Sequence, residues 1–167
     1  IHAISKKFSC PITVLAKKNS RIDELCENDK HIKEVIFLDR NNNKKGRHDG
    51  IFGFFNLLKE IKEKKFEKAF IFNGSLRFKL ICKIAGIEKI YQYPLFRKKD
   101  NVVSSAKNFV DSCIKEDVST QPKLILNEKL VDASKDKYKF EKNLKHICIG
   151  FSASGPTKRW DIEKYLN

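Results

Sequence analysis

The stretch AFIFNGSLRFKLICKIAGIEKIYQYP, residues 69–94, decides the fold class of this chain. It opens with a compact apolar run, Ala69–Phe72, which is typical of a strand whose two faces are both covered. Ser75 then precedes a helix-period segment that ends at Gly86, the pattern of an N-cap and a C-terminal glycine. A short strand is predicted at Lys89–Tyr93. A strand, a helix and a second strand joined by short turns predict a βαβ unit with parallel strands.

The same alternation extends toward the N-terminus. Ile12–Ala16 and Val35–Leu38 are also compact apolar runs, and we expect both to be strands. Ser20 is placed to cap a helix that begins near Arg21. The segment NNNKKGRHDG, residues 41–50, is expected to be a solvated connector. An amphipathic helix should follow it, because apolar residues recur there with a helical period. These residues are Ile51, Phe54, Phe55, Leu58 and Ile61.

The second half of the chain continues with helical and apolar segments. Val102–Ile114 has one continuous apolar stripe and is predicted to be a helix. The segment STQPK, residues 119–123, has the composition of a connector. A short strand is then expected at Leu124–Leu126 and a charged helix at Glu128–Lys139. Another apolar run, Ile147–Gly150, precedes a turn rich in Gly, Ser and Pro.

These patterns predict an α/β fold with a Rossmann-like parallel sheet, plus the first strand and turn of a second Rossmann-like domain. We expect the first domain to span residues 1–120. A connector and the start of the second domain should occupy residues 121–144, and the beginning of that domain proper residues 145–167.

Length and charge restrict the possible classes of protein. The 167 residues are enough for one full hydrophobic core, and 41% hydrophobic residues argue against a disordered chain. No apolar run reaches the roughly 20 residues that a membrane-spanning helix needs. The net charge is +14, with 29 Lys among 35 basic residues, and this charge attracts nucleic acid, anionic membranes and phosphorylated glycolipids alike. Because the chain has no Met and opens inside a helical pattern, we expect a piece of a longer protein.

The five cysteines are widely and irregularly spaced, and none forms a CxxC motif. Reduced thiols are therefore expected rather than a disulfide or zinc framework. No His lies at metal-ligand spacing from them, and the sequence predicts no metal site.

The turn GFSASGPTKRW, residues 150–160, has the composition of a phosphate-binding segment. Backbone N–H groups at a helix N-terminus and Ser or Thr hydroxyls suit phosphate oxygens, and Gly150 and Gly155 permit close approach. A capped turn with surface charges explains the spacing equally well. Two more specific motifs, the P-loop and the GxSxG elbow, do not match this segment. Pro156 replaces the Lys of a P-loop, and Ser154 stands where a hydrolase GxSxG elbow needs Gly.

Together, three segments resemble family 9 glycosyltransferases, the lipopolysaccharide heptosyltransferases. The strand followed by GxSxxxxTKRW resembles the opening of that family's second domain. Residues 10–39 and 64–93 are similar to its earlier strand and helix units, and the likeness extends over essentially the whole chain. The resemblance implies a GT-B enzyme with two Rossmann-like domains, the first for the acceptor glycolipid and the second for the nucleotide sugar.

The resemblance also implies roles for individual residues. The donor diphosphate would be bound by Ser152, Ser154, Thr157 and Lys158. The anionic acceptor would be bound by Asn73, Gly74, Ser75 and Arg77. From the residues alone, a helix N-cap, a turn glycine and a solvated face explain Ser75, Gly74 and Arg77 equally well. The family's catalytic Asp follows a strand expected before Ile1, so no general base is assigned.

The expected function is transfer of heptose from ADP-heptose to a lipopolysaccharide core acceptor with inversion, at the cytoplasmic face of the inner membrane. ADP-heptose is the donor substrate, no cofactor is expected, and these residues alone should be inactive. One alternative is a basic nucleic-acid-binding α/β module. The high pI favours it, but the sequence lacks an Arg-rich stripe or a helix-turn-helix signature, and no specific nucleic acid is expected. Another is a GT-B transferase that uses a different nucleotide sugar.

Overall fold

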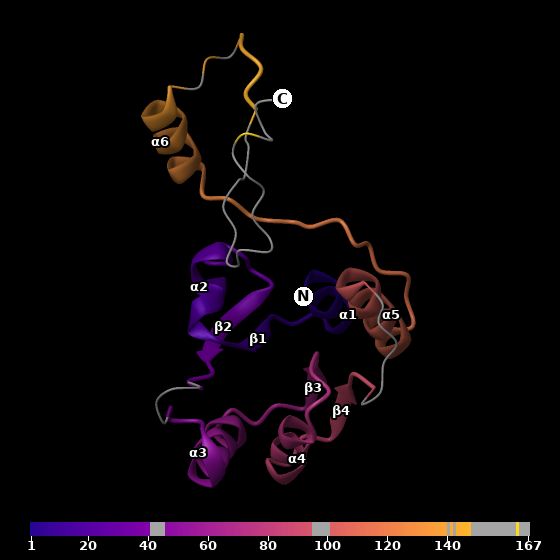
Figure 1. Ribbon diagram of the computed structural model, residues 1–167. Helices are drawn as coiled ribbons and strands as arrows, with labels where there is room; N and C mark the ends of the chain where they lie inside the picture. Colours follow the sequence, from indigo (N-terminus) through magenta and orange to yellow (C-terminus); the bar gives the residue numbers. More distant parts are fainter. Residues whose placement is uncertain (41–45, 95–100, 140, 142, 148–162, 164–167) are drawn as a thin grey trace. The chain divides into compact units, whose positions relative to one another are not determined.

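The computed structural model describes residues 1–40, 46–94, 101–139, 141, 143–147 and 163. The chain divides into two compact units, Ile1–Ile125 and Leu126–Asn167 (Figure 1). The domain ranges expected from the sequence stay predictions. Among the described residues, no helix is long and apolar enough to cross a membrane.

The first unit contains two pairs of parallel strands. β1 (Ile12–Ala16) pairs with β2 (Ile32–Phe37), and β3 (Lys68–Ile71) pairs with β4 (Lys89–Gln92). Within the described residues the two pairs are separate two-stranded sheets. The predicted mixed α/β class with parallel strands is therefore confirmed, whereas one continuous sheet is not observed.

The β3–α4–β4 segment has the predicted βαβ order. α4 spans Leu76–Ile84, and Gly86 follows it with a φ of 87°, in the left-handed region where glycine is favoured. The N–H groups of Gly86 and Ile87 donate to the carbonyls of Lys83 and Cys82. These two bonds form a Schellman motif, which explains why the helix ends there. Gly86 thus closes the helix as predicted.

One hydrophobic core lies between helices α3 and α4 and both pairs of strands. α3 spans Gly50–Glu63, close to the predicted helix. Leu57 and Ile61 of α3 are buried against Ile81 of α4 and Ile87. Partly buried side chains from all four strands pack against them, and these are Leu15, Ile36, Ala69 and Ile90. Both strand pairs therefore share this layer of helices.

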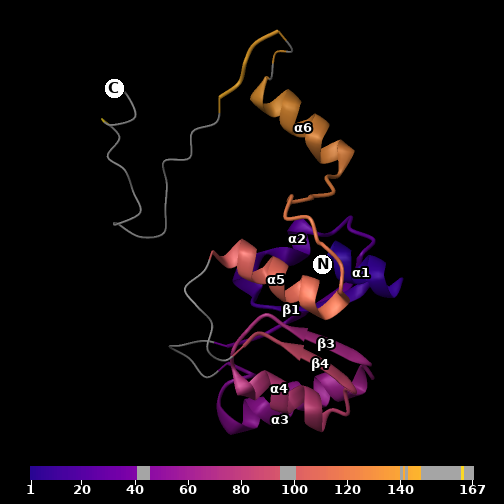
Figure 2. The same cartoon turned by 90° about the vertical axis from the view of Figure 1, so that its right-hand side faces the viewer.

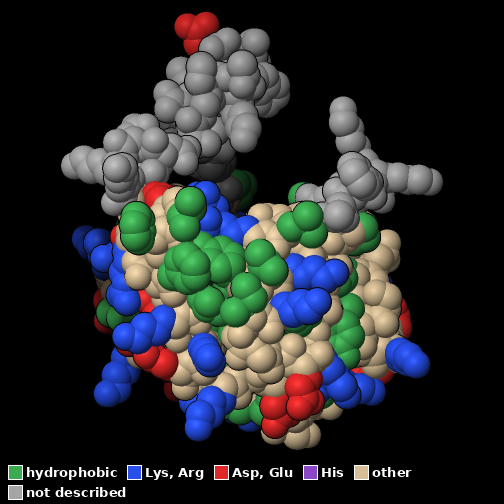
Figure 3. Space-filling model, turned by 90° about the horizontal axis from the view of Figure 1, so that it is seen from below, with side chains coloured by type: hydrophobic (Ala, Val, Ile, Leu, Met, Phe, Trp, Pro, Cys, Tyr) green, Lys and Arg blue, Asp and Glu red, His purple; other side chains and the backbone are tan. Residues whose placement is uncertain are grey.

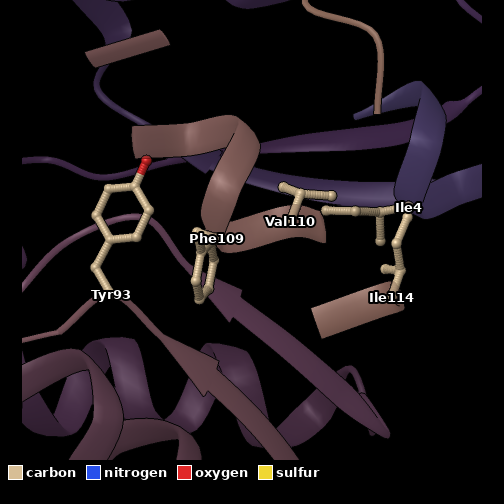
Figure 4. Close-up of a cluster of buried hydrophobic side chains, with 5 residues drawn as sticks. All are labelled: Ile4, Tyr93, Phe109, Val110 and Ile114. Carbon is tan, nitrogen blue, oxygen red and sulfur yellow. The ribbon is translucent and has the colours of Figure 1, made fainter. Parts of the chain in front are cut away.

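A second core lies on the other side of the strands, under α1 (His2–Phe8) and α5 (Val102–Ile114) (Figure 2). Ile4 from α1 meets Val110 and Ile114 from α5, while Tyr93 contacts Phe109 (Figure 4). The Tyr93 and Phe109 rings lie 4.8 Å apart at 78°, an edge-to-face arrangement that aromatic pairs favour. α5 has the bounds predicted from its apolar stripe.

Two local predictions are wrong. Ser20 does not cap a helix, because it lies in a short 3-10 turn, η1 (Lys18–Ser20), and its hydroxyl donates to the Lys17 carbonyl. Arg21 occupies the cap position of the next helix, α2 (Ile22–Leu25). Leu124–Leu126 is not a strand and its three side chains are exposed, since no strand in the described part of the chain pairs with it.

In the second unit, the predicted charged helix is present as α6 (Glu128–Tyr138). The Asn127 side chain caps it by accepting the Lys129 N–H at 3.0 Å. No residue of α6 is buried. Most of the run predicted at Ile147–Gly150, and the turn that follows it, lie outside the described residues.

Candidate functional site

The turn from Asn73 to Ser75 joins β3 to α4. Because β3 and β4 are parallel, their carboxyl ends lie together, and ligands of α/β proteins bind at this edge. Gln92, the last residue of β4, donates from Nε2 to the carbonyls of Asn73 and Ser75, both at 3.0 Å. A side chain of one strand thus fixes the turn that follows the neighbouring strand.

Two side-chain groups of the turn have no partner in the part of the chain that the structure describes. Asn73 Oδ1 accepts the Ser75 N–H at 2.7 Å, which forms an Asx turn. Ser75 occupies the N-cap position of α4, but its side chain accepts no hydrogen bond from the helix. The Ser75 hydroxyl and the Asn73 amide nitrogen therefore have no hydrogen-bond partner among the described residues. Gly74, between them, is exposed.

Arg77 lies near this turn but is engaged elsewhere. Its two terminal nitrogens donate to the carbonyls of His48 and Gly50, each at 3.0 Å. Its guanidinium carbon is 5.6 Å from the centre of the Phe54 ring, within range of a cation–π contact. The Nε atom is buried and has no partner in the described part of the chain. Arg77 thus links the start of α4 to the start of α3, and it does not lie on a solvated face.

The loop of residues 46–50, here the α3 entry loop, is held by hydrogen bonds along its length. The Asp39 carbonyl accepts the His48 N–H at 2.9 Å, and Asp39 Oδ2 accepts the Arg47 N–H at 2.8 Å. Asp49 Oδ2 accepts the Gly46 N–H at 2.9 Å. The expectation of a solvated connector is wrong for His48, which is buried, whereas Arg47 and Gly50 are exposed. Residues 41–45 lie outside the described chain.

The His48 imidazole is the most buried polar group of this loop, with 2% of its surface exposed. Its Nδ1 accepts the Asp39 N–H at 3.0 Å, so the neutral ring carries its proton on Nε2. Nε2 lies 3.3 Å from Glu60 Oε1, which also pairs with Arg47. A Cβ at Gly53 would lie 2.1 Å from the His48 carbonyl carbon, so only glycine fits. No local pattern in the sequence predicts this network, although a glycine within a strong helical pattern, Gly53, is a signal of close backbone packing.

A cleft of about 600 Å³ lies beside the candidate acceptor turn, between β4 and α5. Gln92 contributes to both the cleft and the turn. The lining combines apolar and aromatic side chains with a few hydroxyl and amide groups, a combination found in sites that bind small molecules. The polar groups of the lining belong to Gln92, Tyr93, Ser105, Asn108 and Ser112, among others.

The predicted donor site cannot be placed in the same way. Ser152, Ser154, Thr157 and Lys158 all lie outside the described residues. Two of the chain's loop carboxylates, Asp39 and Asp49, bind the α3 entry loop, as described above.

A separate group of His2, Asp29 and His31 lies near the start of β1, where Ile12 N–H donates to the His31 carbonyl. The possible ligand atoms of the three side chains are all within 4.8 Å of one another. His2 Nε2 bonds Asp29 Oδ2, and Asp29 Oδ1 accepts the His31 N–H. Ser5 donates to the Cys10 carbonyl, so it accepts from His31 Nδ1 and leaves His31 Nε2 open. Burial raises the pKa of Asp29, but the bonds from His2 and His31 outweigh it and lower the pKa overall. These hydrogen bonds connect α1 to the start of β2. A divalent metal ion that used the same ligand atoms would have to displace them.

Searches with this sequence found no matching family model, and the curated proteins and solved structures gave no significant match. The functional assignment below therefore depends on the chemistry of these residues and on the sequence resemblance.

Proposed function

We propose that this chain is part of a GT-B glycosyltransferase that transfers heptose from ADP-heptose to a lipopolysaccharide core acceptor with inversion. The observation that carries the proposal is the rigid turn at Asn73–Ser75. Its backbone is fixed by Gln92, and its amide and hydroxyl groups have no partner among the described residues, next to a cleft lined by both apolar and polar side chains. Such groups are suited to sugar hydroxyls, which need both donors and acceptors.

The arrangement of the strands supports a Rossmann-like sheet. The strands follow one another in the order β2, β1, β3, β4 (Figure 1), and both pairs share the same two helical layers. One more parallel strand between β1 and β3 would join the pairs into a single doubly wound sheet. The strand that the family resemblance predicts before Ile1 would take this place, because it would lead through α1 into β1 by the usual crossover.

The acceptor would be bound by Asn73, Gly74 and Ser75. We propose a different task for Arg77, whose terminal nitrogens already donate to two carbonyls. It would act indirectly, by holding the α3 entry loop against the start of α4. The anionic acceptor would then depend on other cations near the cleft, such as Lys79.

The donor diphosphate would be bound by Ser152, Ser154, Thr157 and Lys158. A base outside these residues would take the proton from the acceptor hydroxyl, which attacks the anomeric carbon from the opposite face. The ammonium group of Lys158 would stabilise the negative charge of the departing diphosphate. The enzyme would work at the cytoplasmic face of the inner membrane.

The decisive experiment uses the intact parent enzyme and Lys158→Ala, with Lys145→Ala as the control because Lys145 is an exposed lysine of the same unit. Loss of transition-state stabilisation should lower kcat/KM about 100-fold in the first variant only. ADP-heptose should be preferred over other nucleotide sugars. Unchanged turnover in Lys158→Ala would contradict the role proposed for Lys158. Tight salt-sensitive binding to duplex DNA without sugar transfer would instead favour the nucleic-acid-binding alternative.

A further inference from the structure

The outer surface of α3 and α4 carries exposed large apolar side chains. Phe52 is 87% exposed and Ile51 is 76% exposed, values unusual for residues of this size. Figure 3 shows this side of the molecule, and hydrophobic side chains gather on it. We call the set the α3/α4 patch, and its residues are Ile51, Phe52, Phe55, Leu76, Leu80 and Ile84.

The two helices bring these residues together by regular spacing. Ile51 and Phe55 are four residues apart on α3, and Leu76, Leu80 and Ile84 are four apart on α4, so each set forms one stripe. The helices pack through Leu57, Ile61 and Ile81 in the core beneath. Arg77 bonds the carbonyls at the start of α3, which keeps the N-terminal ends of both helices together. The stripes therefore lie side by side.

The charge around the patch is strongly positive. Lys59 and Lys62 on α3 and Lys83 on α4 are exposed, and none has an ion pair within the described residues. The two helices contain only two acidic residues, and Glu60 is already paired with Arg47. Basic side chains flank the apolar centre in Figure 3. An apolar surface with unpaired lysines at its margin complements a surface that is apolar inside and anionic outside.

We propose that the α3/α4 patch docks onto an anionic lipid bilayer. Phe52 and Phe55 enter the boundary between headgroups and acyl chains, where aromatic side chains of interfacial helices reside. The flanking lysines contact lipid phosphates and add electrostatic attraction to the anionic surface. A protein partner would be expected to complement the apolar centre, but it would not require this excess of cations.

The proposal deepens the membrane-peripheral location in the proposed function. α4 begins directly after Ser75, so docking would hold the turn at Asn73–Ser75 close to the bilayer, where a glycolipid acceptor is found. Docking itself requires neither the donor nor the acceptor. Failure to bind lipid would therefore overturn the docking surface and leave the proposed glycosyl transfer standing.

The test is co-sedimentation of the chain with vesicles of phosphatidylglycerol and phosphatidylcholine, compared with vesicles of phosphatidylcholine alone. Binding is expected only with the anionic vesicles and should weaken as salt increases. The double variant Phe52→Ser and Phe55→Ser should reduce the partition coefficient about tenfold or more, because two exposed aromatic side chains no longer insert. Lys62→Glu with Lys83→Glu should reduce it as well.

Leu130→Ser on α6 is the matched control, because Leu130 is also exposed, at 61%, but belongs to the second unit. It should bind as the unchanged chain does. Circular dichroism checks that every variant keeps its helices. The proposal is overturned if the unchanged chain ignores anionic vesicles or if the double Phe variant binds them equally well. It is also overturned if sedimentation shows a dimer that this variant dissociates, since the patch would then bind a second copy.

Discussion

Two loops that precede helices in the first unit use their polar groups in opposite ways. In the α3 entry loop, residues 46–50, backbone and side-chain groups bond to Asp39, Asp49 and Glu60. In the turn at Asn73–Ser75, Gln92 fixes the backbone, but the hydroxyl of Ser75 has no partner among the described residues. The comparison indicates that the first loop uses its polar groups to hold the fold together, whereas the second leaves polar groups available among the described residues.

The largest effect on stability is expected from Gly53→Ala. The new Cβ would lie 2.1 Å from the His48 backbone, so α3 or its entry loop must move. We expect a loss of about 3 kcal/mol in the free energy of unfolding, which exceeds the gain of about 1 kcal/mol in helix propensity. Urea denaturation measures it. Ser104→Ala on exposed α5 surface is the control and should change little, and equal stability of both variants would contradict the tight packing of the loop.

Arg77→Leu should come next, because it leaves the carbonyls of His48 and Gly50 without their donors. The expected loss is about 2 kcal/mol of unfolding free energy. In the parent enzyme, the KM for the acceptor should change little at temperatures where the variant stays folded. A large rise in that KM with unchanged stability would mean that Arg77 binds the acceptor directly, as the family resemblance implies.

Gln92→Leu should weaken both stability and binding. The carbonyls of Asn73 and Ser75 lose their shared donor, which costs about 1 kcal/mol. The turn is then less rigid, and the acceptor KM should rise. Gln121→Leu is a control in the exposed segment between α5 and α6. If Gln92→Leu and the control gave the same KM, the fixed turn would have no part in binding.

Ser75→Ala should have the smallest effect on the fold and a clear effect on the acceptor. Since the hydroxyl makes no cap bond, the free energy of unfolding should change by less than about 0.5 kcal/mol. Loss of one hydrogen bond to a sugar hydroxyl should raise the acceptor KM about fivefold. A loss of stability near that of a missing helix cap, without a change in KM, would show instead that Ser75 stabilises α4.

The elements that could be predicted from the sequence are those with strong periodicity or local turn chemistry. The apolar stripe gives α5 its bounds, and Gly86 marks the end of α4 through a motif of adjacent residues. The strand predicted at Leu124–Leu126 was wrong because an apolar triplet becomes a strand only when another strand pairs with it. The helix cap predicted at Ser20 was wrong because the Ser20 hydroxyl donates to a nearby backbone carbonyl instead.

The candidate site was predictable only in part, for a similar reason. The turn at Asn73–Ser75 is local in sequence, so the sequence alone is enough to single it out. The bonds from Gln92 and from Arg77 join residues 15 or more positions apart, and no local pattern announces them. His48 likewise looked like one residue of a polar connector, and its burial follows from packing against α3.

The separation of the strands into two pairs also affects how copies of the molecule associate in solution. In the described structure each strand pairs on one side only, and open strand edges are templates for association between copies. The strands are short, and Lys68 and Lys89 lie at the start of β3 and β4, where charge discourages such pairing. The net charge of +14 acts in the same direction. Purification at low ionic strength should therefore keep the chain dispersed, whereas high salt screens this repulsion and favours precipitation.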